Sequence, residues 1–380
     1  MYPPGGVEKI GLYDPYLEAL GGGEKYILVM AEEAARMPGA HLVLFSPHRP
    51  DVHAWERLNV FLEPGDFEWV AADDQVVTEQ SRDLGLLVTM SNDVPVLNHA
   101  RRAVAMVQFP TRARDAPLER ARSSLARALG RSRAGEALGS YDLFICNSEF
   151  TRDHIKRRLG VHAMVLAPPV DPPLAQGLKK ERRILSVGRF YRGEHHKHQE
   201  VLIRAFAELR SSFAEAANWE LHLVGGAEHH PSTQRWLEEL YSLARGAPVH
   251  LHVNADAATL GKLYATSSLF WHATGYGERA RRHPERLEHF GIATVEAMMG
   301  GAVPLVVPLG GQAEIVRDGV NGRHWRSVGE LVTRSHELIQ NPSRAEALRA
   351  TAREHARPYG KDRFLAEIRE HVLKTPGAAN

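Results

Sequence analysis

The amino-acid sequence predicts an α/β protein in which two doubly wound parallel sheets form two successive domains. The first observation is that short apolar runs alternate with segments of helical periodicity along the chain. The second is that runs such as L-G-L-L-V and V-P-L-V-V are apolar at nearly every position, as in strands covered on both faces. The third is the length of 380 residues, because one domain commonly takes roughly 150 residues.

The predicted strands are short apolar runs bounded by turn residues. In the first half of the chain they are residues 9–13, 41–46, 84–90, 103–109, 142–148 and 163–167. In the second half they are residues 183–188, 220–225, 249–253, 269–272 and 303–307. Amphipathic helices are expected between them, for example over residues 26–36 and 200–210. Repeated β-α-β units of this kind predict parallel sheets with helices on both faces.

A proline-rich segment, residues 168–173, separates the two halves of the chain. Prolines continue neither a helix nor a strand ladder and serve as stiff linkers. We therefore place the domain boundary near residue 178, with one domain over residues 1–177 and a second over 178–357. Ligands of such sheets bind at the carboxyl ends of the strands, so we expect the functional site in a cleft between the domains.

Composition and missing motifs exclude several classes of protein. Lys and Arg number 47 against 46 Asp and Glu, so the formal net charge is +1. Cys146 is the only cysteine, so no intrachain disulfide and no thiolate metal cage is possible. The sequence has no export leader at its start and no apolar run of about 18 residues, so we expect a cytoplasmic protein. Motifs of P-loop enzymes, dinucleotide enzymes, zincins, serine hydrolases and D-x-D metal-nucleotide enzymes are all absent.

Two segments carry candidate ligand-binding residues. Gly22 and Gly23 lie in a run of glycines between a predicted strand and a predicted helix, where backbone N–H groups can approach a phosphate or sugar oxygen. A flexible turn is the alternative. Further along, Glu288 and Glu296 lie eight residues apart around a helix that is expected to begin near Gly291. They can reach different parts of one extended ligand, whereas two solvated glutamates are the plainer interpretation.

The segment from Glu288 to residue 301, EHFGIATVEAMMGG, resembles the E-x7-E motif of retaining glycosyltransferases of family GT4, the glycosyl transferases group 1. Further parts of that family's pattern follow the family order and, with the glycines, extend from residue 21 to residue 322. They are NSEFTR (147–152), APPVD (167–171), ILSVGRF (184–190), LIRAF (202–206), GGQAEIV (310–316) and DGVNG (318–322).

The resemblance implies the GT-B architecture, in which two Rossmann-like domains face a cleft and the C-terminal one holds a nucleotide-sugar donor. The C-terminal helix, within residues 358–380, is expected to cross back onto the N-terminal domain. The implied reaction is a retaining, metal-independent transfer of a hexosyl group, with a lean to mannosyl, from a GDP- or UDP-linked sugar. No cofactor is expected. The acceptor is expected to be a hydroxyl of a glycan, a lipid-linked glycan or a small molecule.

The resemblance also assigns roles to residues. Glu288, Arg189 and Lys197 are the implied catalytic residues, although the loop between Arg189 and Lys197 is longer than in many members. The implied donor-binding residues are Gly22, Gly23, Gly188, Arg189, Lys197, Phe290, Gly291, Ile292 and Glu296. On the acceptor side, His99 and Gln108 are expected at a strand end that faces the cleft, and Tyr276 is expected in a loop that covers the donor.

Other features have plainer interpretations. Histidines at 195, 196, 198, 229 and 230 suggest metal ligands, but no accompanying ligand spacing supports this, so we predict no metal site. Nine arginines between Arg101 and Arg133 suit either an anionic membrane surface or a solvated helix face. The alternative functions are a GT-B-type nucleotide-sugar epimerase or phosphorylase and, more weakly, a basic protein that binds membrane or nucleic acid. We expect no nucleic-acid partner, because no nucleic-acid motif is present.

Overall fold

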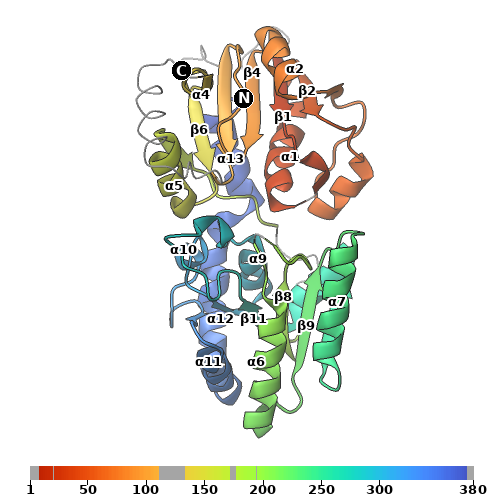
Figure 1. Cartoon of the computed structure of the whole chain (residues 1–380), viewed down its shortest axis with the longest axis vertical. Coiled ribbons are helices and arrows are strands. Elements are labelled where there is room, and N and C mark those ends of the chain that lie inside the picture. Colours follow the sequence, from red (N-terminus) through yellow and green to blue (C-terminus); the bar gives the residue numbers. More distant parts are fainter. Residues whose placement is uncertain (1–7, 20, 111–132, 172–176, 194, 375–380) are drawn as a thin grey trace. The chain divides into compact units, whose positions relative to one another are not determined.

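The computed structural model describes residues 8–19, 21–110, 133–171, 177–193 and 195–374. It divides into two compact units (Figure 1). Unit 1 comprises Met1–Pro169 together with Lys361–Asn380, and unit 2 comprises Val170–Gly360. The backbone of Val170 donates to the carbonyl of Tyr359 at 2.9 Å, so the two ends of unit 2 are joined by a hydrogen bond.

Unit 1 is built on a seven-stranded sheet in the order β3-β2-β1-β4-β5-β6-β7, with every strand pair parallel. The strands are β1 (Glu8–Tyr13), β2 (Ala40–Ser46), β3 (Glu68–Ala71), β4 (Leu86–Ser91), β5 (Arg102–Val107), β6 (Leu143–Cys146) and β7 (Ala163–Val165). The helices are α1 (Gly22–Ala35), α2 (Asp74–Gln80), α4 (Arg133–Gly139), α5 (Glu149–Leu159) and α13 (Lys361–His371).

Alternate residues of these strands enter different cores, because side chains of a strand point to opposite faces of the sheet. Ile10 and Leu12 belong to the core that includes residues of α1 and α13. On β2, Val43 and Phe45 pack with Val77 of α2 instead. Both faces of the sheet are therefore covered by helices, as the continuous apolar runs predicted.

The C-terminal helix α13 packs in unit 1, which confirms the predicted crossing back of the chain. Phe364 is fully buried and meets Tyr26 of α1 edge to face, with ring centroids 5.0 Å apart. Two ion pairs also join α13 to α1: Lys361 Nζ lies 2.8 Å from Glu32 Oε2, and Arg369 Nε lies 2.6 Å from Glu33 Oε1. The α1–α13 contact therefore combines an aromatic core with charged pairs at its border.

Unit 2 is built on a six-stranded parallel sheet in the order β10-β9-β8-β11-β12-β13. Its strands are β8 (Glu181–Val187), β9 (Glu220–Gly225), β10 (Val249–Val253), β11 (Ser267–His272), β12 (Val303–Val306) and β13 (Arg323–His324). Its helices are α6 (Gln199–Ser212), α7 (Pro231–Ala244), α8 (Ala257–Thr266), α9 (Ile292–Gly300), α10 (Gln312–Ile315), α11 (Val328–Gln340) and α12 (Pro342–Ala356).

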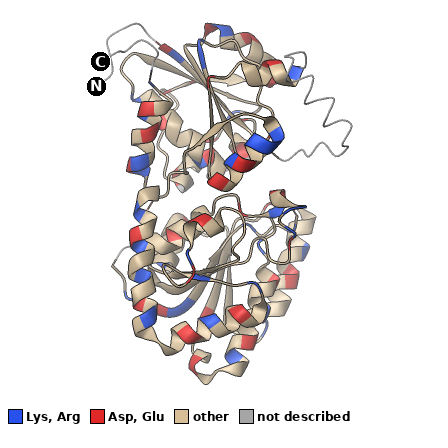
Figure 2. Ribbon diagram, turned by 90° about the vertical axis from the view of Figure 1, so that its left-hand side faces the viewer, with Lys and Arg blue, Asp and Glu red and all other residues tan. Residues whose placement is uncertain are grey.

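The sheet of unit 2 is also covered on both faces. Leu269 and Trp271 of β11 belong to the core that includes α6, α7 and α11, whereas Phe270 between them packs with Leu263 and Tyr264 of α8. Figure 2 shows the charged residues mainly on helices and loops, while most of the strands are uncharged. This distribution is expected for strands that are buried on both faces.

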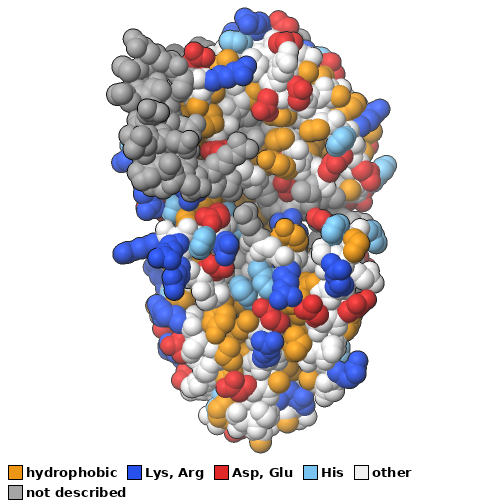
Figure 3. All heavy atoms as spheres, in the orientation of Figure 1, with side chains coloured by type: hydrophobic (Ala, Val, Ile, Leu, Met, Phe, Trp, Pro, Cys, Tyr) orange, Lys and Arg blue, Asp and Glu red, His pale blue; other side chains and the backbone are white. Residues whose placement is uncertain are grey.

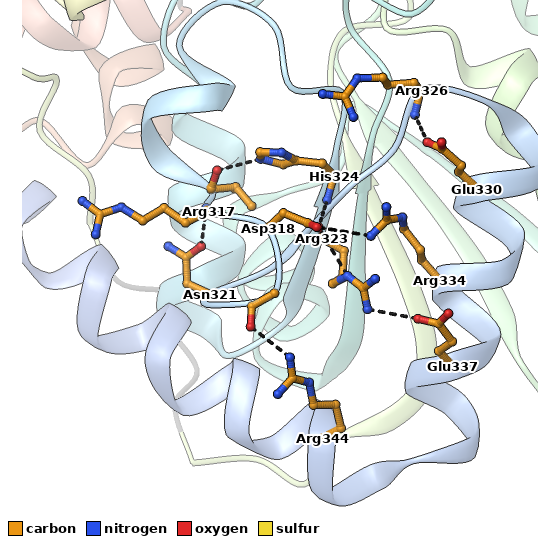
Figure 4. Close-up of polar contacts among 12 residues, drawn as sticks. Arg317, Asp318, Asn321, Arg323, His324, Arg326, Glu330, Arg334, Glu337 and Arg344 are labelled. Carbon is orange, nitrogen blue, oxygen red and sulfur yellow. Dashed lines mark hydrogen bonds and ion pairs between the residues drawn. The ribbon is translucent and has the colours of Figure 1, made fainter.

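The DGVNG segment (318–322) forms a tight turn before β13 (Figure 4). The Asn321 side chain accepts from the backbone N–H of Arg317 at 2.6 Å and donates to the carbonyl of Ile315 at 2.9 Å. Asp318 Oδ1 accepts from the backbone N–H of His324 at 2.8 Å and from Arg334 of α11 at 3.2 Å. The segment therefore has a structural role, tying β13 to its neighbours.

The sequence predicted most of these strands to within two or three residues, and β9 and β10 have the predicted bounds. It missed β3 and β13. Strand β3 carries partly exposed residues and lacks an apolar run, and β13 has only two residues.

The Arg-rich stretch between Arg101 and Arg133 lies largely outside the described residues, which resume at residue 133 after residue 110. Arg101 lies 3.5 Å from Glu8, and Arg102 donates to the carbonyls of His371 and Val372 at the end of α13. These two arginines thus have structural partners. Among the described residues, no helix combines the length and the apolarity needed to cross a membrane.

Lys180 joins the carboxyl ends of two helices of unit 2. Its Nζ donates to the carbonyls of Ala265 at 2.8 Å and Gly300 at 2.6 Å, at the ends of α8 and α9. We expect Lys180→Met to lower the free energy of unfolding by about 2 kcal/mol, because both carbonyls lose a charged donor. Urea unfolding checks this, with Lys179→Met at the exposed neighbouring position as the control. Equal stabilities of the two variants would contradict the assignment.

Asp14 follows β1 at the start of the loop that leads to the glycine run. It is 2% exposed, and burial, reinforced by Glu24, raises the pKa of its carboxyl to about 7. Because this pKa exceeds the ordinary value of 3.8 for an aspartate carboxyl, folding favours the protonated form. The associated stability is complete below about pH 4 and is lost as the pH rises to about 7.

We therefore expect Asp14→Asn to become more stable relative to the wild type as the pH rises from 4 to 7. The gain is at most about 4 kcal/mol, since one pKa unit corresponds to about 1.4 kcal/mol. Urea unfolding of both proteins at pH 4.5, 6 and 8 measures it. Asp83→Asn, at an exposed position of the same unit, serves as the control. A pH trend shared by both variants would rule out Asp14 as its source.

Candidate active site

The candidate site lies in unit 2, at the carboxyl ends of its parallel strands. Gly188 and Arg189 directly follow β8, and His272 is the last residue of β11. The loop after β12 contains Gly310 and Gly311. Because the carboxyl ends of parallel strands share one edge of a sheet, these segments meet where α/β proteins bind ligands.

At this edge, Lys197, His272 and Glu288 form a connected polar group. Lys197 Nζ donates to Glu288 Oε2 at 2.6 Å, and His272 Nε2 lies 3.0 Å from the same oxygen. Burial alone would raise the pKa of Glu288, but Lys197 and His272 outweigh it and hold this pKa well below its usual range. Burial lowers the pKa of His272, which keeps the imidazole neutral at pH 7. Glu288 is therefore a fixed carboxylate paired with a fixed cation.

Gln312 of α10 borders this group, with its Nε2 3.5 Å from His272 Nε2. Among the described residues, neither Nδ1 of His272 nor Oε1 of Gln312 has a hydrogen-bond partner, although both atoms are buried. An unpaired buried polar atom costs about 1–3 kcal/mol, and such atoms in native proteins call for an explanation such as a functional role. This deficit makes the surroundings of Glu288 a candidate site for a ligand.

The path of Lys197 depends on a glycine at the end of β8. A Cβ at Gly188 would lie 2.7 Å from Cγ of Lys197, too close for any other residue without a shift of the lysine stem. Gln199 Nε2 donates to the carbonyl of Arg189 at 3.0 Å and so ties the start of α6 to the end of β8. The Arg189 side chain itself is exposed. The structure thus brings together Gly188 and Lys197, two of the predicted site residues.

A second close approach shapes the loop that carries Glu288. The backbone N–H of Gly311 donates to the carbonyl of Glu288 at 2.8 Å, and a Cβ at Gly311 would lie 2.4 Å from the carbonyl oxygen of His289. Gly291, the residue before α9, has φ of +116°, which L side chains rarely adopt. The helix begins at Ile292, one residue after the predicted start. Phe290 is buried against Tyr359, with ring centroids 5.4 Å apart.

Glu296 lies in the first half of α9 and accepts a hydrogen bond from the Tyr264 hydroxyl at 2.7 Å. Burial, with Glu296 adding to it, raises the pKa of Tyr264 well above its usual value, so the tyrosine stays protonated and donates. The side chain of Glu296 is partly exposed. Tyr264 orients this carboxylate, and the sequence analysis did not identify that partner.

In unit 1, two predicted residues from distant segments lie together. Gly22 and Gly23 begin α1, after β1, and Gln108 directly follows β5. A Cβ at Gly23 would lie 1.6 Å from Nε2 of Gln108, so the glutamine side chain occupies the space next to this glycine. The glycine run and Gln108 therefore lie next to each other at the carboxyl edge of this sheet.

The expected position of His99 is wrong. His99 precedes β5 and Gln108 follows it, so the six residues of β5, roughly 20 Å of strand, separate their positions along the chain. The His99 side chain is exposed, and its backbone N–H donates to Oγ of Ser81, which precedes β4, at 2.8 Å. The chain returns across the sheet between β4 and β5, and this reversal brings His99 to the amino-terminal edge.

Tyr276 lies in the loop after β11, where it packs against Trp325 with ring centroids 5.1 Å apart. The sequence analysis placed Tyr276 in a loop over the donor, and this aromatic contact fixes the ring within unit 2. Neither His272 nor Gln312 was predicted from the sequence as a residue of the candidate site. For His272 a signal was present, since a polar residue at the carboxyl end of a buried strand commonly faces a ligand.

Comparison with known proteins agrees with this geometry. Residues 175–355 match the model of the family described as glycosyl transferases group 1. A GDP-Man:Man(3)GlcNAc(2)-PP-Dol alpha-1,2-mannosyltransferase from Dictyostelium discoideum is 25% identical over 262 residues, which cover 63% of this chain and 49% of that protein. The chain thus spans about half the length of this curated relative.

Two solved structures share the fold over nearly the whole chain. A glycosyltransferase from Rickettsia africae ESF-5 has a TM-score of 0.69 at 14% identity and covers 98% of this chain and 99% of its own. Alr3699/HepE from Anabaena, in complex with UDP, has a TM-score of 0.70 at 16% identity and covers 96% and 99%. HepE is also solved with UDP-glucose. The chain therefore has the GT-B fold of these structures, and its residues 175–355 match the glycosyl transferases group 1 family.

Proposed function

We propose that this protein is a retaining, metal-independent glycosyltransferase of the GT4 type that moves a hexosyl group from a nucleoside diphosphate sugar to an acceptor hydroxyl. The observation that carries the proposal is the partly buried Lys197–Glu288 pair, 2.6 Å between Nζ and Oε2, at the carboxyl edge of the unit 2 sheet. A carboxylate suits sugar hydroxyls and a cation suits phosphate oxygens, so the pair suits the two ends of an activated sugar.

The proposed donor contacts lie mainly in unit 2. Arg189 and Lys197 hold the diphosphate, Glu288 accepts hydrogen bonds from sugar hydroxyls, and Glu296 accepts them from the ribose. The backbone from Phe290 to Ile292 offers N–H groups at the start of α9, where the helix dipole favours an anion. Gly188 leaves room for Lys197, and Gly22 and Gly23 of unit 1 are proposed as further contacts with the diphosphate.

In the proposed reaction, the bond between the sugar C1 and the diphosphate oxygen breaks as the acceptor oxygen bonds to C1 on the same face. The leaving phosphate oxygen takes the proton of the acceptor hydroxyl. Negative charge grows on that oxygen during the step, so the fixed charges of Arg189 and Lys197 stabilise the transition state more than the ground state. Two cations and a helix N-terminus can neutralise this charge without a metal ion, and the sequence has no D-x-D motif to hold one.

The donor and acceptor are proposed from the relatives. The Dictyostelium relative is named for GDP-mannose, which supports a mannosyl donor, whereas the HepE complexes contain UDP and UDP-glucose. We propose GDP-mannose first and UDP-sugars as the competing donors. For the acceptor side we propose a glycan, a lipid-linked glycan or a small molecule near Gln108 and Tyr276. A cytoplasmic location, with peripheral contact to anionic lipid through the Arg-rich stretch, remains a prediction of the sequence.

The test is a transfer and donor-hydrolysis assay in EDTA with GDP-mannose, UDP-glucose and UDP-N-acetylglucosamine. We expect one donor to be consumed, and Arg189→Met to lower kcat about a hundredfold because one cation no longer faces the leaving group. Glu288→Gln is expected to lose most activity while keeping the side-chain volume. Arg192→Met is the matched control, because Arg192 is exposed, lies in the same loop and pairs with Glu239 at 3.0 Å.

Several outcomes would contradict the proposal. Equal activities of Arg189→Met and Arg192→Met would remove the diphosphate role of Arg189. Activity that requires an added divalent ion would exclude metal independence. Conversion of a nucleotide sugar to its epimer without an acceptor, detected by NMR, would indicate the epimerase alternative, and phosphate-dependent release of a sugar phosphate would indicate a phosphorylase.

A further inference from the structure

The loop before α6 carries a second polar cluster, which the proposed reaction does not use. His196, His198 and Glu200 each place one ligand atom within 4.8 Å of the others. Their side chains are only 15%, 17% and 18% exposed. On the face drawn in Figure 3, histidine side chains of unit 2 lie among acidic and basic ones. The three residues follow the pattern His-x-His-x-Glu at the start of a helix.

Alternate residues of this loop contact different partners, and this separates the cluster from the candidate active site. Lys197 Nζ donates to Glu288, and Gln199 Nε2 donates to the carbonyl of Arg189. The three residues at positions 196, 198 and 200 converge on one another instead. Trp236 of α7 borders the cluster, with its ring 5.3 Å from that of His196 and edge-on to it. Bulk water is thereby kept from one side of the cluster.

Two distances within the cluster, one to each carboxylate oxygen of Glu200, are close to the spacing of ligand atoms around a tetrahedral ion. His196 Nε2 lies 3.4 Å from Glu200 Oε2, and His198 Nδ1 lies 3.4 Å from Glu200 Oε1. Ligand atoms of a tetrahedral Zn²⁺ site, at about 2.0–2.1 Å from the metal, are about 3.3 Å apart. Nε2 of His196 and Oε2 of Glu200 are buried and have no hydrogen-bond partner among the described residues. A cation between them would satisfy both atoms.

A second cluster with suitable ligand types, Glu220, His222 and His250, is less favourable. Arg183 Nε donates to His222 Nε2 at 3.0 Å, and His222 Nδ1 lies 2.9 Å from His252 Nε2. Both ring nitrogens of His222 therefore have partners already. A metal ion there would have to displace a guanidinium group, whereas the cluster at 196–200 has unpaired atoms facing each other.

We propose that His196, His198 and Glu200 bind a divalent transition-metal ion of the Zn²⁺ type, with a fourth position for water. This inference differs from the sequence analysis, which predicted no metal site, because sequence alone did not show Glu200 meeting the two histidines. The ion links the loop to the first turn of α6 and fixes the backbone on both sides of Lys197. It does not take part in the transfer step.

A consequence follows for the donor, and it rests on the proposed function. A fixed loop holds Lys197 in place before the donor binds, so less ordering accompanies binding. We expect saturating Zn²⁺ to lower the KM for the donor roughly three- to tenfold while kcat changes little. Transfer in EDTA persists at the higher KM.

The experiment uses the full chain without a histidine tag, freed of metal by EDTA and dialysis. Titration with Co²⁺ is expected to give one equivalent of intense absorption between about 500 and 700 nm, as tetrahedral Co²⁺ does, and Zn²⁺ is expected to abolish it. His196→Gln and Glu200→Gln should weaken Zn²⁺ binding at least about tenfold, since even partners of ligands cost 10–100-fold. His250→Gln, in the second cluster, is the matched control.

Circular dichroism shows whether each variant is folded. If a variant does not fold, a measurement on the wild-type protein tests the metal site instead. Zn²⁺ should protect His196 and His198 from diethyl pyrocarbonate, as read by mass spectrometry. Binding below one equivalent, or binding lost in His250→Gln and kept in His196→Gln, would overturn the site. One equivalent of bound Zn²⁺ with an unchanged donor KM supports the site and refutes its coupling to Lys197. If no donor supports transfer, that result contradicts the proposed function, whereas the measurement of metal binding remains valid.

Discussion

The contact between Lys197 and Glu288 is the interaction on which the organisation of unit 2 around its site depends. Burying a carboxylate is costly unless a cation and hydrogen bonds compensate it. Here Lys197 comes from the loop after β8, His272 from the end of β11, and Glu288 from the loop before α9. Two strand connections, from β8 to α6 and from β11 to α9, must therefore be correctly placed for one carboxylate to remain charged.

Close backbone approaches make this placement possible. Lys197 reaches Glu288 because position 188 has no side chain, and the Glu288 loop lies against residue 311 for the same reason. The carbonyl of Glu288 is held by the backbone of Gly311, so its side chain extends from an anchored main chain. Side chains held in this way need little reorganisation when a charged ligand binds, which is the property that electrostatic catalysis requires.

The sequence was sufficient for most of the fold because the central strands of both sheets, such as β4 and β12, are buried on two faces and mostly apolar. It failed at β3 and β13, which are partly exposed or very short. For the site, spacing and family resemblance identified Lys197 and Glu288, whose 2.6 Å contact spans 91 residues of sequence. His272 carried a signal at the end of a buried strand, but its contact with Glu288, 16 residues further along, required the structure. His99 was misplaced although the predicted strand over residues 103–109 begins after it, because parallel strands require the chain to return to the amino-terminal edge before that strand.

The same reasoning explains why polar atoms without partners are found on both sides of Lys197. On one side, His272 and Gln312 leave buried acceptors next to Glu288, and on the other, His196 and Glu200 leave buried atoms facing each other. Each deficit costs stability in the chain alone, and nothing in the core packing of unit 2 requires it. A loop under selection for stability alone would replace these groups with apolar ones of similar volume. We therefore propose that ligands complete both sides of Lys197: a sugar nucleotide on the Glu288 side and a metal ion on the Glu200 side.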